Sequence, residues 1–112
     1  QNDMKKQGRP WCIGKGFDHS APIGPITPAA QAGNVGKAGI WLQVNGVDRQ
    51  RSNVAQLIWN IAETIEHLSA AWELQPGDLI YTGTPEGVGA VVTGDVLEGG
   101  VDGLGSIRLK LV

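Results

Sequence analysis

Two stretches of the chain contain side chains and backbone turns of the kinds found in catalytic or binding sites. In the first, Lys15 lies between Gly14 and Gly16, so a backbone bend could aim its ammonium group into a cleft and toward a carboxylate or an enolate. A lysine on the surface is the more common case. Asp18 and His19 follow closely, and they could act as base or ligand or make local hydrogen bonds in a turn.

The second stretch is the glycine-rich segment 83–89, which reads Gly-Thr-Pro-Glu-Gly-Val-Gly. It lacks the Gly-Lys-Ser/Thr ending of a phosphate-binding loop, and it does not open a helix. Two interpretations remain, a structural turn or a strand end at which the backbone approaches a ligand closely. Composition alone favours the structural turn.

Metal and thiol chemistry have no strong motif in this sequence. Glu63 and His67 are four residues apart on one predicted helix face, but this face is polar and solvated residues explain it better than ligands. No Glu-x-Glu, Cys-x-x-Cys or His-x-x-x-His spacing occurs. Cys12 is the single cysteine, which excludes an internal disulfide and predicts a reducing, cytoplasmic location.

Length and charge exclude several classes of protein. The chain has 112 residues and a net charge of −2, so it suffices for one domain and shows no basic patch for nucleic acid. Its apolar runs are too short for a membrane span. The 17 glycines and six prolines predict many tight turns.

A β-hairpin is predicted over 39–51. Apolar and polar residues alternate before Asn45-Gly46, a pair suited to the positive φ angles of a two-residue turn. An amphipathic helix is predicted over about 53–71, with Asn53 as its N-cap and Gln56 reaching back. Its apolar stripe consists of Val54, Leu57, Ile58, Ile61, Ile65 and Leu68.

The remaining elements are short. Residues 21–30 contain three prolines and are expected to form an extended segment or an edge strand. Short strands are predicted at 79–82, 90–92 and 95–98, and a half-buried strand at 106–112 closes the chain. The order does not alternate strictly between strands and helices, so the sequence predicts an α+β fold, mostly β.

Four segments taken together resemble a known family. They are residues 8–11, residues 14–25, Val44-Asn45-Gly46 with Arg49-Gln50, and residues 75–89. In this order and spacing they resemble the C-terminal half of the fumarylacetoacetate hydrolase family, in particular its bacterial acylpyruvate and fumarylpyruvate hydrolases. The resemblance covers essentially the whole chain. The 75–89 segment is specific for the superfamily but not for one substrate.

This resemblance implies a mixed β-sandwich roll that assembles as a homodimer. Members bind Mg²⁺ (or Mn²⁺ or Ca²⁺) through a Glu-x-Glu pair and an aspartate. They hydrolyse a C–C bond in acylpyruvates or related β-diketo acids such as fumarylpyruvate, chemistry that belongs to aromatic catabolism. Relatives decarboxylate, isomerise or tautomerise related oxo-acids, and this is the alternative function.

The resemblance also implies roles for a few residues. Gln1 matches a glutamine that touches the substrate, and Lys15 matches the catalytic lysine beside the metal and the oxo-acid group. Thr84 matches a threonine that binds the substrate carboxylate, and Gly83 matches a position at which the backbone approaches the ligand. His19 stands where some members have a threonine, so no role is transferred to it.

The family's carboxylate ligands have no counterpart in this sequence, which begins with Gln1. We therefore expect residues 1–112 to be the C-terminal portion of a single catalytic domain whose metal ligands lie upstream of Gln1. The isolated chain is expected to be inactive and free of metal. A truncated, non-catalytic remnant that serves folding or dimerisation is the remaining alternative.

Overall fold

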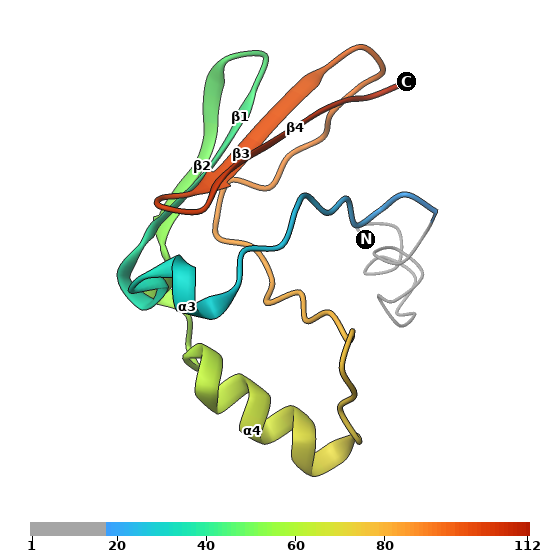
Figure 1. Cartoon of the computed structure of the whole chain (residues 1–112). Coiled ribbons are helices and arrows are strands. Elements are labelled where there is room, and N and C mark those ends of the chain that lie inside the picture. Colours follow the sequence, from blue (N-terminus) through green and yellow to red (C-terminus); the bar gives the residue numbers. More distant parts are fainter. Residues whose placement is uncertain (1–17) are drawn as a thin grey trace.

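The computed structural model describes residues 18–112 of the chain (Figure 1). Four strands form one antiparallel sheet with the order β2-β1-β3-β4, and the predicted α+β, mostly β class is confirmed. The elements are α3 (Ala29–Ala32), the 3-10 turn η1 (Val35–Lys37), β1 (Gly39–Val44), β2 (Val47–Asn53), the 3-10 turn η2 (Val54–Gln56), α4 (Ile61–Ala71), β3 (Val96–Val101) and β4 (Gly105–Lys110).

The β1–β2 hairpin forms where the sequence predicts it. Asn45 and Gly46 have φ angles of 52° and 81°, the left-handed pair that a two-residue hairpin turn needs. Asn45 also ties this turn to the next strand, since its Oδ1 accepts from the Val96 N–H at 2.9 Å and its Nδ2 donates to Asp95 at 2.9 Å. One asparagine therefore serves two elements about 50 residues apart.

A β-bulge interrupts β2. Leu42 pairs with Gln50 and the next residue of β1, Gln43, pairs with Asp48, which leaves Arg49 as the extra residue. In a regular strand Asp48 and Gln50 would share a face, because side chains alternate with a period of two. The bulge places them on opposite faces of the sheet.

The two faces of the sheet differ in chemistry. Paired positions place most of the apolar side chains on one face, namely Ile40, Leu42, Val44, Leu97, Val101, Ile107 and Leu109, whereas Trp41 and Val96 lie on the other. The same pairing places charged side chains on the other, namely Asp48, Arg51, Glu98, Arg108 and Lys110. Val44 is the one residue of 18–112 in the buried class, at 5% exposure, so the most buried point of the apolar face lies at the end of β1, next to the β1–β2 turn.

The predicted helix is shorter than expected. It begins at Ile61 rather than near Asn53, because Asn60 and Glu63 form the capping box: the Glu63 N–H donates to Asn60 Oδ1 at 2.8 Å and the Asn60 N–H to Glu63 Oε1 at 3.2 Å. Asn53 instead ends β2 and caps η2 by accepting from the Ala55 N–H at 2.9 Å. The predicted cap with Gln56 was wrong.

The strands predicted at 79–82 and 90–92 are absent; both stretches are irregular. Their β-forming residues fit a strand, but a strand also needs a neighbour to complete its hydrogen bonds, and none pairs with them among the described residues. Residues 22–28 form no edge strand and lead into α3. The strands predicted at 95–98 and 106–112 correspond to β3 and β4 with shifted ends.

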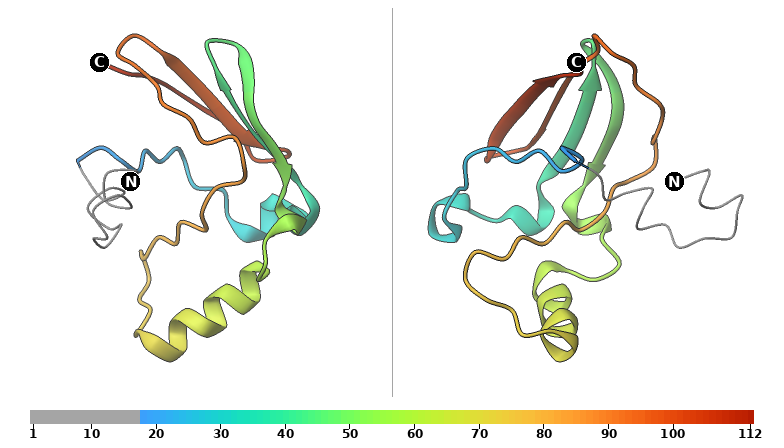
Figure 2. Two further views of the ribbon diagram at one scale, coloured as in Figure 1. Left: turned by 180° about the vertical axis from the view of Figure 1, so that it is seen from behind. Right: turned by 90° about the vertical axis from the view of Figure 1, so that its right-hand side faces the viewer.

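Figures 1 and 2 show α4 at one end of the molecule and the β1–β2 turn at the other. The β3–β4 turn lies at the opposite end of the sheet, where the Asp102 N–H donates to the Gly39 carbonyl at 2.9 Å. The long connection 72–95 runs from α4 back to β3 past the middle of the molecule. Within the described residues, no helix is long and apolar enough to cross a membrane. The site segment 83–89 lies on this connection.

Candidate functional site

A glutamine of the sheet holds the loop 83–86. Gln50 Nε2 donates to Thr84 Oγ1 at 2.7 Å and to the Pro85 carbonyl oxygen at 2.8 Å, with a longer contact of 3.3 Å to the Glu86 carbonyl. Gln50 is half-buried, whereas Thr84 is exposed. One amide group on β2 therefore fixes both the side chain of Thr84 and the backbone that follows it.

Gly87 lets the same loop lie against β2. Its φ angle is 100°, and a Cβ atom there would collide with the carbonyl oxygen of Arg49 and stand 3.1 Å from Cγ of Gln50. Glycine is required for both reasons. Gly83 also has a left-handed φ of 90°, but the space around it is open. The segment is thus a turn packed on its own sheet, and the proximity of Gly83 to a ligand stays a prediction.

The segment that follows Lys15 meets the segment that precedes Thr84. The hydroxyl of Tyr81 donates to the carbonyl of Ala21 at 3.1 Å, across 60 residues of sequence. Lys15 and Gln1 themselves lie outside the described residues, as does Cys12. One hydrogen bond therefore joins a residue that follows the first stretch to a residue that precedes the second.

Asp18 and His19 form an exposed turn, in which His19 has a left-handed φ of 61°. Their possible role as base or ligand stays a prediction. Glu63 belongs to the capping box and His67 stacks on Trp59, with ring centroids 4.0 Å apart. Each of these helix residues thus has a local structural partner.

A divalent ion does not fit the described side chains alone. In residues 18–112, no three His, Cys, Asp or Glu side chains gather into a cage. Glu86 borders an open hollow, but its other lining residues are the neutral Ser52, Asn53, Gln56 and Pro85. We therefore derive no chemical step through a metal from these residues.

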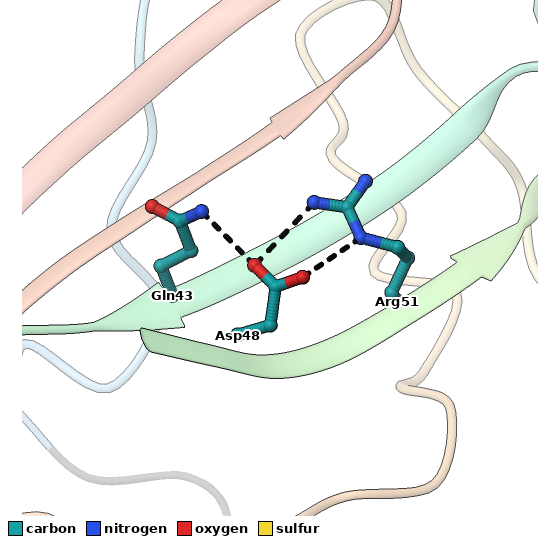
Figure 3. Close-up of polar contacts among 3 residues, drawn as sticks. All are labelled: Gln43, Asp48 and Arg51. Carbon is teal, nitrogen blue, oxygen red and sulfur yellow. Dashed lines mark hydrogen bonds and ion pairs between the residues drawn. The ribbon is translucent and has the colours of Figure 1, made fainter. Parts of the chain in front are cut away.

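A second polar cluster occupies the other face of the sheet (Figure 3). Gln43 Nε2 donates to Asp48 Oδ1 at 2.9 Å, and Arg51 Nε lies 3.1 Å from Asp48 Oδ2. The Arg51 guanidinium, and then the Gln43 amide, lower the pKa of Asp48 below its ordinary value. This cluster is exposed and touches no predicted site residue.

Sequence reasoning missed Gln50 as a site residue. The pair Arg49-Gln50 contributes to the family resemblance but received no role. Its role depends on the bulge at Arg49 and on a loop 34 residues further along the chain. No local pattern signals either.

Comparison with known proteins identifies a family and several relatives that this chain resembles. The family described as "Fumarylacetoacetate (FAA) hydrolase C-terminal" matches residues 1–112. Fumarylpyruvate hydrolase of Ralstonia sp. is 50% identical over 107 residues, which cover 96% of this chain and 55% of the relative. The mitochondrial oxaloacetate tautomerase of Rattus norvegicus is 40% identical over 111 residues, 99% of this chain and 50% of the relative.

A solved structure agrees. The fumarylpyruvate hydrolase of Pseudomonas aeruginosa, in complex with Mn²⁺ and pyruvate, superimposes with a TM-score of 0.93 at 57% identity, over 100% of this chain and 48% of that one. The chain spans about half the length of the relatives it matches. It belongs to the fumarylacetoacetate hydrolase family.

Proposed function

We propose that this chain is the C-terminal part of the catalytic domain of a hydrolase that cleaves a C–C bond in fumarylpyruvate or a related acylpyruvate. The carrying observation is the 57% identity, over the whole chain, to a fumarylpyruvate hydrolase that binds Mn²⁺ and pyruvate. Pyruvate is one of the two products when water cleaves fumarylpyruvate, the other being fumarate. The Gln50-held loop supports the proposal because it presents the Thr84 hydroxyl at the surface.

In this proposal the chain binds the pyruvate end of the substrate. Thr84 donates a hydrogen bond to the carboxylate, and Gly83 lets the backbone come close to it. Water adds to the distal carbonyl, the C–C bond breaks, and its electron pair leaves as the enolate of pyruvate, which is then protonated. The Lys15 ammonium stabilises the enolate charge, and Gln1 contacts the substrate.

A divalent ion, Mn²⁺ or Mg²⁺ or Ca²⁺, supplies further positive charge when it is bound. We assign none of its ligands to this chain and propose that upstream carboxylates hold it. A homodimeric, cytoplasmic enzyme of aromatic catabolism is part of the same proposal.

The test uses the polypeptide in which this chain naturally occurs, with fumarylpyruvate, acetylpyruvate and oxaloacetate as substrates. We expect release of pyruvate from an acylpyruvate in the presence of Mn²⁺ or Mg²⁺, and loss of this activity with a chelator. Lys15→Ala and Thr84→Val are each expected to lower kcat/KM on the order of 10²-fold. Thr93→Val is the matched control, because Thr93 is an exposed threonine in the turn that precedes β3. Wild-type kinetics in both site variants would contradict the assigned roles.

Oxaloacetate tautomerisation is the second candidate, favoured by the 40% identity to a mitochondrial oxaloacetate tautomerase over 99% of this chain. It passes through an enolate of oxaloacetate, another 2-oxo acid, and breaks no C–C bond. Interconversion of oxaloacetate tautomers without consumption of any acylpyruvate would favour it over the hydrolase. Absence of both activities would favour a non-catalytic remnant.

A further inference from the structure

We propose that Gln50 is a positioning residue that sets the direction in which the Thr84 hydroxyl donates its hydrogen. The inference rests on the proposed function, in which Thr84 binds a substrate carboxylate. It concerns a residue that never touches the substrate and acts through the threonine.

The donors and acceptors around Gln50 admit one orientation of its amide. The carbonyl oxygens of Pro85 and Glu86 accept hydrogen bonds and cannot donate. They lie 2.8 and 3.3 Å from the terminal atom of Gln50, so this atom must be Nε2. The same Nε2 is 2.7 Å from Thr84 Oγ1. An amide nitrogen donates hydrogen bonds and does not accept them. Thr84 therefore accepts from Gln50.

This fixes what Thr84 can do next. A hydroxyl has one hydrogen and two lone pairs, and one lone pair is used by Gln50. Within residues 18–112, Gln50 is the one partner of the Thr84 side chain. Its hydrogen is therefore available to an acceptor on the solvent side, and a carboxylate oxygen is an acceptor without a donor of its own.

The sheet and the loop hold the backbone around Gln50 in place. Gln50 pairs with Leu42, two residues from the buried Val44. The bulge at Arg49 turns Gln50 to the face opposite Asp48, and the Arg49 carbonyl packs against Gly87. Two consecutive residues of β2 thus hold the loop at two points, Gln50 at Thr84–Pro85 and Arg49 at Gly87, which limits movement of residues 84–87.

The experiment is a double-mutant cycle in the polypeptide that carries this chain. Gln50→Met removes the donor and keeps the length of the side chain, and we expect KM for an acylpyruvate to rise about tenfold or more with a smaller change in kcat. In a Thr84→Val background the same Gln50→Met substitution should have no further effect, because Gln50 acts through Thr84. Equal losses in both backgrounds, or no loss in either, would overturn the proposal.

Gln50→Glu and Gln43→Met complete the design. A glutamate at position 50 accepts the Thr84 hydrogen and faces two carbonyl oxygens, so KM should rise at least as much as in Gln50→Met. Gln43→Met removes a glutamine donor from the opposite face and should leave KM unchanged. Thermal unfolding of each variant checks that the fold is retained. A normal KM in Gln50→Glu, or a raised KM in Gln43→Met, counts against the proposal.

A second readout separates this inference from the proposed function. If the wild type cleaves no acylpyruvate, the hydrolase proposal fails, and NMR of the side-chain amides still tests Gln50. We expect slowed proton exchange of the Gln50 side-chain amide and cross-relaxation between it and the Thr84 methyl group. A Gln50 amide that exchanges as fast as a free glutamine and shows no cross-relaxation to Thr84 would overturn the inference.

Discussion

Gln43 and Gln50 lie on neighbouring strands, and the same type of side chain has a different structural role in each case. Gln43 of β1 donates to Asp48, five residues away, and Asp48 already holds Arg51, three residues further on (Figure 3). Gln50 of β2 donates to a loop 34 to 36 residues away, and two of its acceptors are backbone carbonyls. The first cluster orders side chains on one hairpin, whereas the second fixes the course of the chain.

The difference has one structural cause, the bulge at Arg49. It brings Asp48 and Arg51 to the charged face although their odd spacing would separate them in a regular strand. It also turns Gln50 to the apolar face, where the loop 83–89 lies. Because of this one extra residue, the partner of Gln43, Asp48, lies on the charged face, whereas Gln50 lies on the apolar face beside the candidate site.

The largest effect is expected from Gly87→Ala. A methyl group at Gly87 collides with the Arg49 carbonyl at a φ of 100°, so unfolding free energy should fall by about 2–4 kcal/mol, measured by chemical denaturation. Gly94→Ala is the matched control, since its φ is 95° with nothing within 4 Å; backbone strain alone should cost about 1 kcal/mol. Equal losses in the two variants would show that the loop is not packed on β2.

A smaller effect is expected from Asn60→Ala, which removes the cap of α4. The expected loss is about 1 kcal/mol of unfolding free energy, measured in the same way. The bonds of this box span three residues, so NMR shifts of Thr84 should stay unchanged. Gln56→Ala is the control and should cost little. A change in the NMR shifts of Thr84 would show that the capping box of α4 is coupled to the loop that Gln50 holds.

Asp95 accepts hydrogen bonds from the Val92 N–H and the Asn45 amide, and acid is expected to lower the stability that these bonds provide. The Val92 N–H and then the Asn45 amide lower the pKa of Asp95 below its ordinary value of 3.8. The stabilisation is therefore present above pH 3.8 and is lost as the pH falls through the lowered pKa. Denaturation midpoints measured at decreasing pH should fall in the wild type and fall less in Asp95→Asn. An identical decline in both would contradict this assignment.

The smallest effect is expected from Arg51→Ala. Arg51 forms an ion pair with Asp48, and the two side chains are 59% and 50% exposed. Exposed ion pairs of this kind contribute little to the free energy of unfolding. The denaturation midpoint should shift slightly in dilute buffer and not at all in about 1 M salt, where screening is nearly complete. The kinetics of the polypeptide should not change. Loss of activity would show that the charged face also takes part in function.

Features encoded by neighbouring residues could be predicted from the sequence. The turn at Asn45-Gly46 is correct because two adjacent residues decide it, and the closing strand is correct because alternation identifies it. The helix start was misplaced because Asn53 and Asn60 are both good caps, and the choice between them depends on β2 extending to Asn53.

Features that depend on distant partners could not be predicted. Residues 79–82 consist of β-formers, yet no described strand pairs with them. Thr84 was predicted as a site residue through resemblance, but its contact with Gln50 needs the bulge and the long connection from α4. Lys15 and Gln1 lie outside the described residues, so their roles stay predictions.

The most direct test of the central claim is the affinity for pyruvate, measured by calorimetric titration of the polypeptide with Mn²⁺ present. Thr84→Val should weaken pyruvate binding by about tenfold or more, because a hydrogen bond to a charged group is lost. Thr93→Val should bind as the wild type does. Equal pyruvate affinity in Thr84→Val and the wild type would contradict the claim that this loop holds the carboxylate.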